Sequence, residues 1–141
     1  APATTALDLD YACKCDFFVP NETELEILTG MPVETEEQIH AAADKLLDNG
    51  LKNLVVTLGE KGALWMHGEE TNHFSAPNVS AVDTTGAGDA FIGCFAHSFG
   101  RDGDIEKAIG LAVKYASHSV TGKGTQTSYA NAEEFDSLPW G

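Results

Sequence analysis

Residues 82–91 read VDTTGAGDAF, a loop that runs directly into a predicted helix. The apolar residues from Ala87 onward recur at helical spacing and predict one buried stripe: Ala87, Ala90, Phe91, Cys94, Phe95 and Phe99. Gly86 and Gly88 stand where this helix begins, so no Cβ covers the backbone there. The first N–H groups of a helix lack internal partners, and the helix dipole adds positive charge at that end. The segment therefore predicts an anion site, with phosphate as the expected anion.

Asp89 belongs to the first turn of the same helix. Its carboxylate would lie beside the bound anion, where a general base is useful. A second interpretation needs no ligand, because glycine-rich helix starts are common and a first-turn Asp is a favourable partner of the helix dipole. The short pattern G-x-G-D leaves both interpretations open.

The longer string DTTGAGDAF, residues 83–91, resembles the signature of the ribokinase-like sugar kinases, the phosphofructokinase-B family. The resemblance implies that Gly86, Ala87 and Gly88 form the anion hole for the transferred phosphoryl group. It implies that Asp89 takes the proton from the sugar hydroxyl. It also implies the fold class: an α/β, ribokinase-like three-layer sandwich with a mostly parallel central sheet, of which this chain would be the C-terminal half.

The segment DFFVPNETE, residues 16–24, reads as a short buried strand followed by a helix start. Pro20 ends the strand, Asn21 is a good helix N-cap, and Glu24 stands at the capping-box position. NETE also resembles a second signature of the same family. On that resemblance Asn21 and Glu24 help to organise Mg²⁺ and the nucleotide phosphates, and both interpretations can hold together.

Residues 35–58 contain a helix and then a strand. The helix has a buried stripe and ends at Asn49-Gly50, and Leu54 to Leu58 is a fully apolar strand of the kind buried on both faces. Strand, helix and strand in this order predict a parallel crossover unit. The buried stripe consists of Ile39, Ala42, Ala43, Leu46 and Leu47.

The sequence TLGEKG, residues 57–62, leaves the carboxyl end of that strand, where ligands bind in open α/β sheets. It lacks the spacing of a Walker A loop, and a tight turn into a hairpin of residues 63–66 and 71–75 would explain it structurally. In the resembling family a T-L-G-x-x-G segment contacts ATP, which implies that Thr57, Gly59 and Gly62 line the nucleotide.

A second long helix is predicted from Ile105 to about Val120, and a short one from Asn131 to Leu138. Between them, residues 121–128, TGKGTQTS, form a polar loop that exposes backbone carbonyls, which are good ligands for a hard cation. The alternative is a flexible connection. The resemblance implies an activating K⁺ site, although Thr125 replaces the small residue usual there. Its ligands would be Asp83, Thr85, Ser119, Gly122, Gly124 and Ser128.

The chain of 141 residues carries 22 acidic and 8 basic side chains, a formal net charge of -14. This charge argues against nucleic acid as a partner, because such binding depends on Lys and Arg. It does not exclude ATP, because backbone N–H groups and Mg²⁺ can hold phosphates. No apolar run approaches the roughly 20 residues of a membrane helix. The three cysteines are odd in number and one lies on a buried stripe, which favours a reducing, cytoplasmic setting.

The resemblance extends from about residue 16 to 128 and implies ATP, Mg²⁺ and K⁺ as cofactors. The expected reaction is phosphorylation of a sugar hydroxyl, on ribose or a related pentose or hexose, by an enzyme that is a homodimer at full length. Residues 1–141 would be its C-terminal nucleotide-binding and catalytic part, inactive alone. The first residue is not Met, and we expect a piece of a longer chain with no secretion signal at residues 1–5.

Two other functions stay open at this point. The chain could be a non-catalytic nucleotide-binding or interaction module, or a kinase of the same family that acts on a nucleoside. A dinucleotide-binding domain is disfavoured, because no G-x-G-x-x-G follows the first strand.

Overall fold

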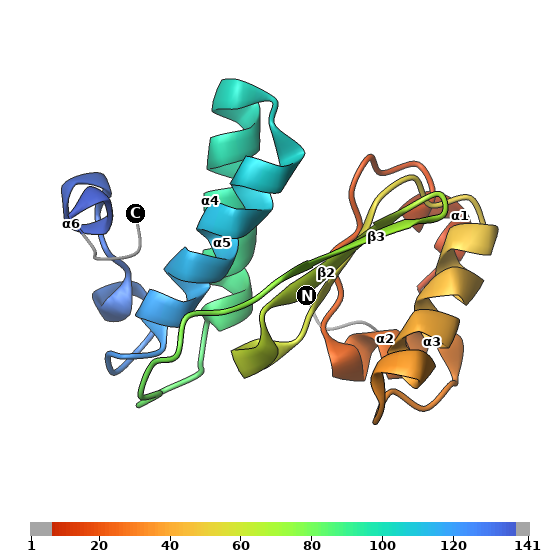
Figure 1. The fold of residues 1–141 in the computed structure, drawn as a ribbon, viewed down its shortest axis with the longest axis horizontal. Helices are drawn as coiled ribbons and strands as arrows, with labels where there is room; N and C mark the ends of the chain where they lie inside the picture. The colour runs from red at the N-terminus through yellow and green to blue at the C-terminus, as the bar shows by residue number, and fades with distance from the viewer. Residues whose placement is uncertain (1–6, 138–141) are drawn as a thin grey trace. The chain divides into compact units, whose positions relative to one another are not determined.

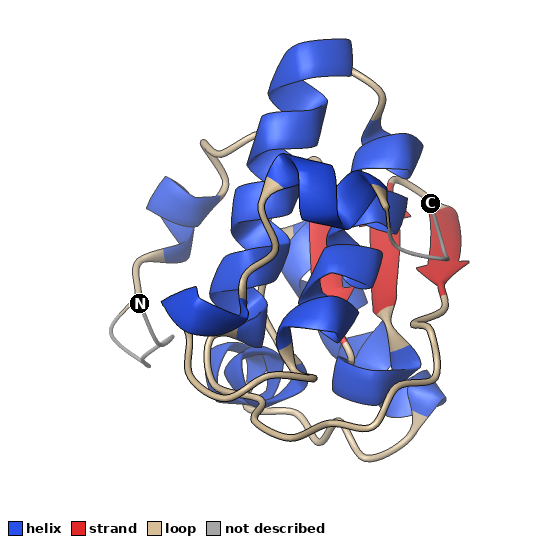
Figure 2. Ribbon diagram, turned by 90° about the vertical axis from the view of Figure 1, so that its left-hand side faces the viewer, coloured by secondary structure: helices blue, strands red, loops and turns tan. Residues whose placement is uncertain are grey.

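The structure is a computed structural model that describes residues 7–137, and these divide into two compact units. The first unit comprises Ala1–Gly59 and Ala63–His73, and the second comprises Glu60–Gly62 and Phe74–Gly141, each over its described residues. Figure 1 traces the elements along the chain, and Figure 2 separates helices from strands by colour.

The first unit contains a three-stranded sheet in the order β1-β2-β3. Strands β1 (Leu54–Thr57) and β2 (Ala63–His67) pair antiparallel, with Leu54 opposite Met66 and Thr57 opposite Ala63, and β3 (Glu70–Phe74) follows. The predicted strand and hairpin are therefore confirmed, with ends that differ by one residue. The turn between β1 and β2 contains the short 3₁₀ helix η1 (Gly59–Lys61).

Residues 18–21 run parallel to β1 on its other side, as the predicted crossover requires. Phe18 pairs with Leu54 and Asn21 with Thr57. The Phe18 N–H donates to the Asn53 carbonyl at 3.0 Å, and the Thr57 N–H donates to the Pro20 carbonyl at 3.0 Å. Pro20 has no N–H to continue the ladder, so the predicted strand is reduced to two isolated bridges. Among the described residues, the parallel part of the sheet is limited to this segment.

Helices α2 (Glu22–Thr29) and α3 (Glu36–Asp48) begin with capping boxes, at Asn21 and Thr35 respectively. A short helix, α1 (Leu9–Ala12), was not predicted, because its pattern is weak. The α3 stripe is buried as expected, with Leu47 only partly so, and it packs into one cluster with the apolar side of β1. The largest fully buried side chains of that cluster are Leu25, Leu46, Leu54, Val56 and Leu64.

The second unit is built on two long helices that pack against each other, α4 (Ala87–Asp102) and α5 (Ile105–Ser119). The predicted stripe of α4 is buried at Ala90, Phe91 and Phe95, whereas Ala87, Cys94 and Phe99 are only partly buried. The 3₁₀ helix η2 (Gln126–Ser128) and the short α6 (Ala132–Asp136) follow, and Asn131 caps α6. Leu138, the predicted end of this last helix, lies outside the described residues. The buried stripe of α5 consists of Ala108, Ile109, Ala112 and Val113.

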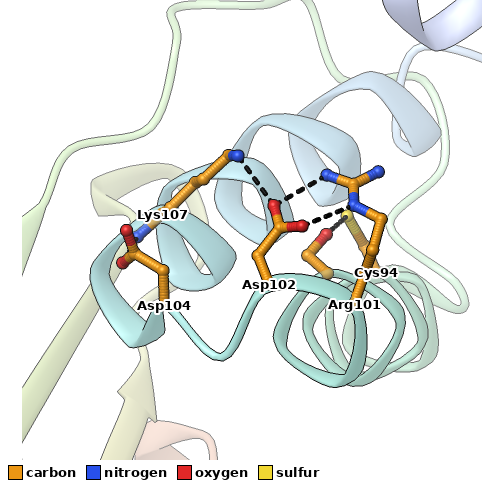
Figure 3. Close-up of polar contacts among 6 residues, drawn as sticks. Cys94, Arg101, Asp102, Asp104 and Lys107 are labelled. Atoms are coloured by element: carbon orange, nitrogen blue, oxygen red, sulfur yellow. Dashed lines mark hydrogen bonds and ion pairs between the residues drawn. The ribbon is translucent and has the colours of Figure 1, made fainter.

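An ionic cluster joins the end of α4 to the start of α5 (Figure 3). The Asp102 carboxylate accepts hydrogen bonds from Arg101 Nε at 2.9 Å, Arg101 Nη2 at 3.0 Å and Lys107 Nζ at 2.7 Å. Asp104 caps α5 by accepting from the Lys107 N–H at 3.0 Å. The hydrogen bonds from Arg101 and Lys107 hold the pKa of Asp102 well below its usual range.

Two expectations from composition can be compared with the described residues. Cys13, Cys15 and Cys94 are free thiols in the described part of the chain. Burial raises the pKa of Cys94. None of the helices in residues 7–137 combines the length and apolar character needed to span a bilayer.

Candidate functional site

The N-terminus of α4 has the open backbone that its sequence predicts. Gly86 is the N-cap in the left-handed conformation, with φ 82°, and no side chain caps this end. The Ala90 N–H donates to the Gly86 carbonyl at 2.9 Å, and the Ala87 N–H makes a longer bond of 3.3 Å to the Thr84 carbonyl. Within the described part of the chain, the N–H groups of Gly88 and Asp89 have no such partner. These two donors are available to an anion.

The space around this helix end suits a ligand. A Cβ placed on Gly88 would meet nothing within 4 Å, so the structure gives no packing reason for glycine there. Asp89 is exposed on the first turn, on the same end of α4 as the two N–H donors. The helix end thus offers hydrogen-bond donors for an anion and a carboxylate beside them.

Asp83 ties the loop before α4 to the loop after α5. One carboxylate oxygen accepts from the Thr85 N–H at 2.9 Å, and the other accepts from the Gly124 N–H at 3.1 Å. The Asp83 N–H also donates to the Val120 carbonyl at 3.1 Å. Hydrogen bonds from Thr85, side chain and backbone, and from the Gly124 N–H lower the pKa of Asp83. Asp83 therefore links the loop before α4 to the loop after α5, about 40 residues later in the sequence.

The residues predicted to bind K⁺ gather in this same region. The Ser128 hydroxyl donates to the carbonyls of Gly124 at 2.6 Å and Thr125 at 2.7 Å. A Cβ on Gly122 would lie 3.0 Å from the Ser128 Cβ. The Ser119 hydroxyl is buried and donates to the Ala116 carbonyl at 2.8 Å, so it is directed to its own helix. Carboxylate, carbonyl and hydroxyl oxygens fit a hard cation in kind. No group of three or more His, Cys, Asp or Glu that could hold a metal occurs among the described residues.

Asn21 and Glu24 form the predicted capping box in the first unit. The Glu24 N–H donates to Asn21 Oδ1 at 2.8 Å, and the Asn21 N–H donates to Glu24 Oε2 at 3.0 Å. Asn21 also pairs with Thr57, so the start of α2 lies beside the carboxyl end of β1. The structure thus brings three predicted nucleotide-site residues to one edge of the sheet, and it supports the structural interpretation of the Asn21 and Glu24 side chains in full.

Packing requires a glycine at position 62 but not at position 59. Both have positive φ, of 56° and 102°, but a Cβ on Gly59 would meet nothing within 4 Å. A Cβ on Gly62 would overlap the Phe74 carbonyl oxygen and lie 2.8 Å from the Ala76 N. Gly62 is therefore required by the close approach of the chain at residues 74–76. This packing reason is sufficient without a nucleotide.

Tyr129 lies outside every motif of the sequence and contacts the same helix end. Its hydroxyl donates to the Gly86 carbonyl at 2.9 Å, across 43 residues of chain. The same hydroxyl lies 2.6 Å from where a Cβ on Gly86 would be, and Thr125 Cγ2 lies 3.0 Å from it. The only signal in the sequence is an aromatic residue directly after a polar, glycine-rich loop, which does not specify a partner.

The comparisons with known proteins agree on one family. A family model described as "pfkB family carbohydrate kinase" matches residues 2–132. The chain is 63% identical over 136 residues to a protein named deoxyribokinase from Salmonella typhi, which covers 96% of this chain and 44% of that protein. The chain thus spans less than half the length of that relative.

Two solved structures are similar in fold. One is a ribokinase from Arabidopsis thaliana complexed with ribose and ATP, with a TM-score of 0.84 and 38% identity over 91% of this chain and 42% of that one. The other is an aminoimidazole riboside kinase from Salmonella enterica complexed with its riboside and an ATP analogue, with a TM-score of 0.81 and 30% identity over 91% and 43%. These likenesses confirm the ribokinase-like α/β class expected from the sequence.

Proposed function

The chain belongs to the pfkB family of carbohydrate kinases, and we propose that it is the C-terminal nucleotide-binding and catalytic part of an ATP-dependent sugar kinase. The observation that carries this proposal is the N-terminus of α4, where unpartnered N–H groups, open space at Gly88 and the exposed Asp89 occur together. This combination is what transfer of a phosphoryl group to a hydroxyl requires.

In the proposed reaction the backbone at Gly86, Ala87 and Gly88 is the anion hole for the γ-phosphoryl group. Its N–H groups are fixed before the substrate arrives, so they stabilise the charge on the moving group at no cost of reorganisation. Asp89 accepts the proton from the attacking sugar hydroxyl. Because the transition state of phosphoryl transfer is loose, a weak base that takes the proton late is sufficient.

The remaining predicted residues have supporting roles in this proposal. Asn21 and Glu24 lie beside the end of β1, where they would organise Mg²⁺ and the phosphates, and Mg²⁺ when bound neutralises phosphate charge. Thr57, Gly59 and Gly62 would line the nucleotide. Asp83 and the 119–128 loop would hold K⁺. In this role Asp83 would also fix the loop that leads into the anion hole, through its bonds to Thr85 and Gly124.

We infer that 2-deoxyribose is the first acceptor to test and ribose the second. The sequence match to a deoxyribokinase, 63% identity over 136 residues, exceeds that to an Arabidopsis ribokinase, 45% over 111 residues. The kinase is expected to act in the cytoplasm, and as a homodimer at full length.

The direct experiment measures sugar-dependent ADP formation by the full-length protein with 2-deoxyribose and with ribose. We expect saturable turnover with a pentose and a higher kcat/KM for 2-deoxyribose. ATP binding without turnover on any sugar would instead favour a non-catalytic nucleotide-binding module.

A nucleoside acceptor is the second candidate. It is favoured by the likeness to the aminoimidazole riboside kinase. A panel of nucleosides in the same assay separates it from the sugar kinase, because turnover on a riboside but not on a free pentose would replace the first proposal.

The proposed K⁺ site has its own test. Asp83→Asn keeps the size of the side chain but has one acceptor oxygen in place of two. It therefore cannot accept the Thr85 N–H and the Gly124 N–H on separate oxygens, as Asp83 does. We expect wild-type turnover to rise with K⁺ and the response to be lost in the variant. A K⁺ response of normal size in Asp83→Asn would remove Asp83 from the proposed ligand set.

A further inference from the structure

We propose that Tyr129 is a positioning residue for the anion hole, through its hydrogen bond to the Gly86 carbonyl. This inference rests on the proposed function, because it assigns a role in the same site. Tyr129 belongs to none of the predicted motifs, and its contact with Gly86 links the segment after η2 to the start of α4.

The hydrogen bond from Tyr129 acts on the Gly86–Ala87 peptide. The Gly86 carbonyl and the Ala87 N–H belong to one planar group and point in opposite directions. A donor that fixes the carbonyl therefore fixes the direction of the Ala87 N–H as well. The Ala87 N–H has only a long bond, of 3.3 Å, to the Thr84 carbonyl, which constrains it weakly. The Tyr129 hydroxyl thus restrains the Ala87 N–H group of the proposed anion hole.

The backbone at Gly86 is conformationally less restricted than at other residues. The tilt of this peptide plane depends on ψ of Gly86, and Gly86, at φ 82°, has no Cβ to restrict that angle, so the plane is held less firmly here than it would be at another residue. Apart from Tyr129, the Gly86 carbonyl accepts from one backbone donor, the Ala90 N–H at 2.9 Å. This bond belongs to the first turn of the helix, and helix ends fray. A second donor at 2.9 Å adds to that restraint. It also polarises the peptide and strengthens its N–H as a donor.

Tyr129 is itself held in place by aromatic packing. Its ring lies against Tyr115 with centroids 6.3 Å apart, and Tyr115 makes an edge contact with Phe135 at 5.3 Å. This aromatic cluster (Tyr115, Tyr129 and Phe135) connects α5, the segment after η2 and α6. The tyrosine hydroxyl is therefore presented to Gly86 from a packed support.

The test compares two matched variants of the full-length enzyme, Tyr129→Phe and Tyr115→Phe. Each removes one hydroxyl from the same cluster, but only Tyr129 contacts Gly86. Loss of a direct anion-hole donor lowers kcat about 10²–10³-fold. Tyr129 acts on such a donor only through the Gly86–Ala87 peptide, so we expect kcat of Tyr129→Phe to fall less, by about tenfold. The KM for ATP should change by less than about twofold, because the defect affects the transferring group. Tyr115→Phe should keep the wild-type kcat.

Kinetics of the two variants and of the wild type distinguish failure of the positioning role from failure of the kinase proposal. A wild-type kcat in Tyr129→Phe, or an equal fall in Tyr115→Phe, would overturn the positioning role while the kinase proposal stands. No sugar- or nucleoside-dependent turnover by the wild type would overturn the proposed function instead. A crystal structure of Tyr129→Phe gives a readout that does not depend on turnover: we expect the Gly86–Ala87 peptide to be reoriented or disordered, and an unchanged peptide would overturn the inference.

Discussion

Two glycines at the start of α4 have different physical roles, and substitution by alanine separates them. Gly86 has positive φ, and its Cβ would collide with the Tyr129 hydroxyl, whereas Gly88 lacks positive φ and has open space. We expect Gly86→Ala to destabilise the protein by about 1–2 kcal/mol from the left-handed backbone, with the collision in addition. Gly88→Ala should not lower stability, because alanine favours a helix, but it should lower turnover by placing a methyl group in the anion hole.

Urea denaturation and kcat, measured on both variants, check this contrast. Equal loss of stability in the two variants would mean that the space at Gly88 is not open as described. Full turnover in Gly88→Ala would place the phosphoryl group elsewhere.

At the scale of elements, α2 and α6 begin with the same capping box, Asn-x-x-Glu. Asn21 with Glu24 and Asn131 with Glu134 make the same pair of reciprocal hydrogen bonds. Replacing either Asn by Ala should destabilise its helix by about 1 kcal/mol. Only Asn21→Ala should also weaken turnover and MgATP binding, since Asn21 pairs with Thr57 at the end of β1, in the predicted nucleotide segment. Calorimetric titration with an ATP analogue in Mg²⁺ measures this, and equal affinity in the two variants would leave Asn21 with the capping role alone.

The ionic cluster between α4 and α5 predicts a pH dependence of stability. The folded pKa of Asp102 lies below its usual value because Arg101 and Lys107 bond to the carboxylate. A lowered pKa stabilises the fold above the unfolded pKa, about 3.9, and this contribution is lost as the pH falls through the folded value. Asp102→Asn should therefore lower the urea midpoint by the same amount at pH 7 and pH 5. The difference should shrink below about pH 4, and a difference that grows in acid would contradict the assigned direction.

At the scale of the whole molecule, local patterns predicted most of the elements. The cap at Asn21 and the buried stripe of α3 follow rules that act within a few residues, and they are confirmed. The two long helices predicted from Ala87 and from Ile105 are present as α4 and α5. The strand at residues 16–20 was overestimated, because one missing N–H at Pro20 interrupts the ladder. The short α1 was missed because four residues carry too little pattern.

The candidate site was predicted less completely, because its contacts are long-range. Asp83 reaches Gly124, and Tyr129 reaches Gly86, across more than 40 residues each, and no periodicity encodes such pairs. Gly62 was predicted to line the nucleotide, yet the chain at Phe74 already requires glycine there. The net charge of -14 is compatible with a phosphate ligand, since the proposed anion hole consists of backbone N–H groups.

The central claim is that the N-terminus of α4 is the phosphoryl-transfer site and that Asp89 is its base. The most direct measurement is kcat of the full-length enzyme with Asp89→Asn, beside ATP affinity, with Glu106→Gln as the control. Glu106 is also an exposed acidic residue in the first turn of a helix, α5. We expect Asp89→Asn to lose about 10²–10⁴-fold in kcat while ATP still binds, and Glu106→Gln to be normal. Near-normal turnover in Asp89→Asn would contradict the account.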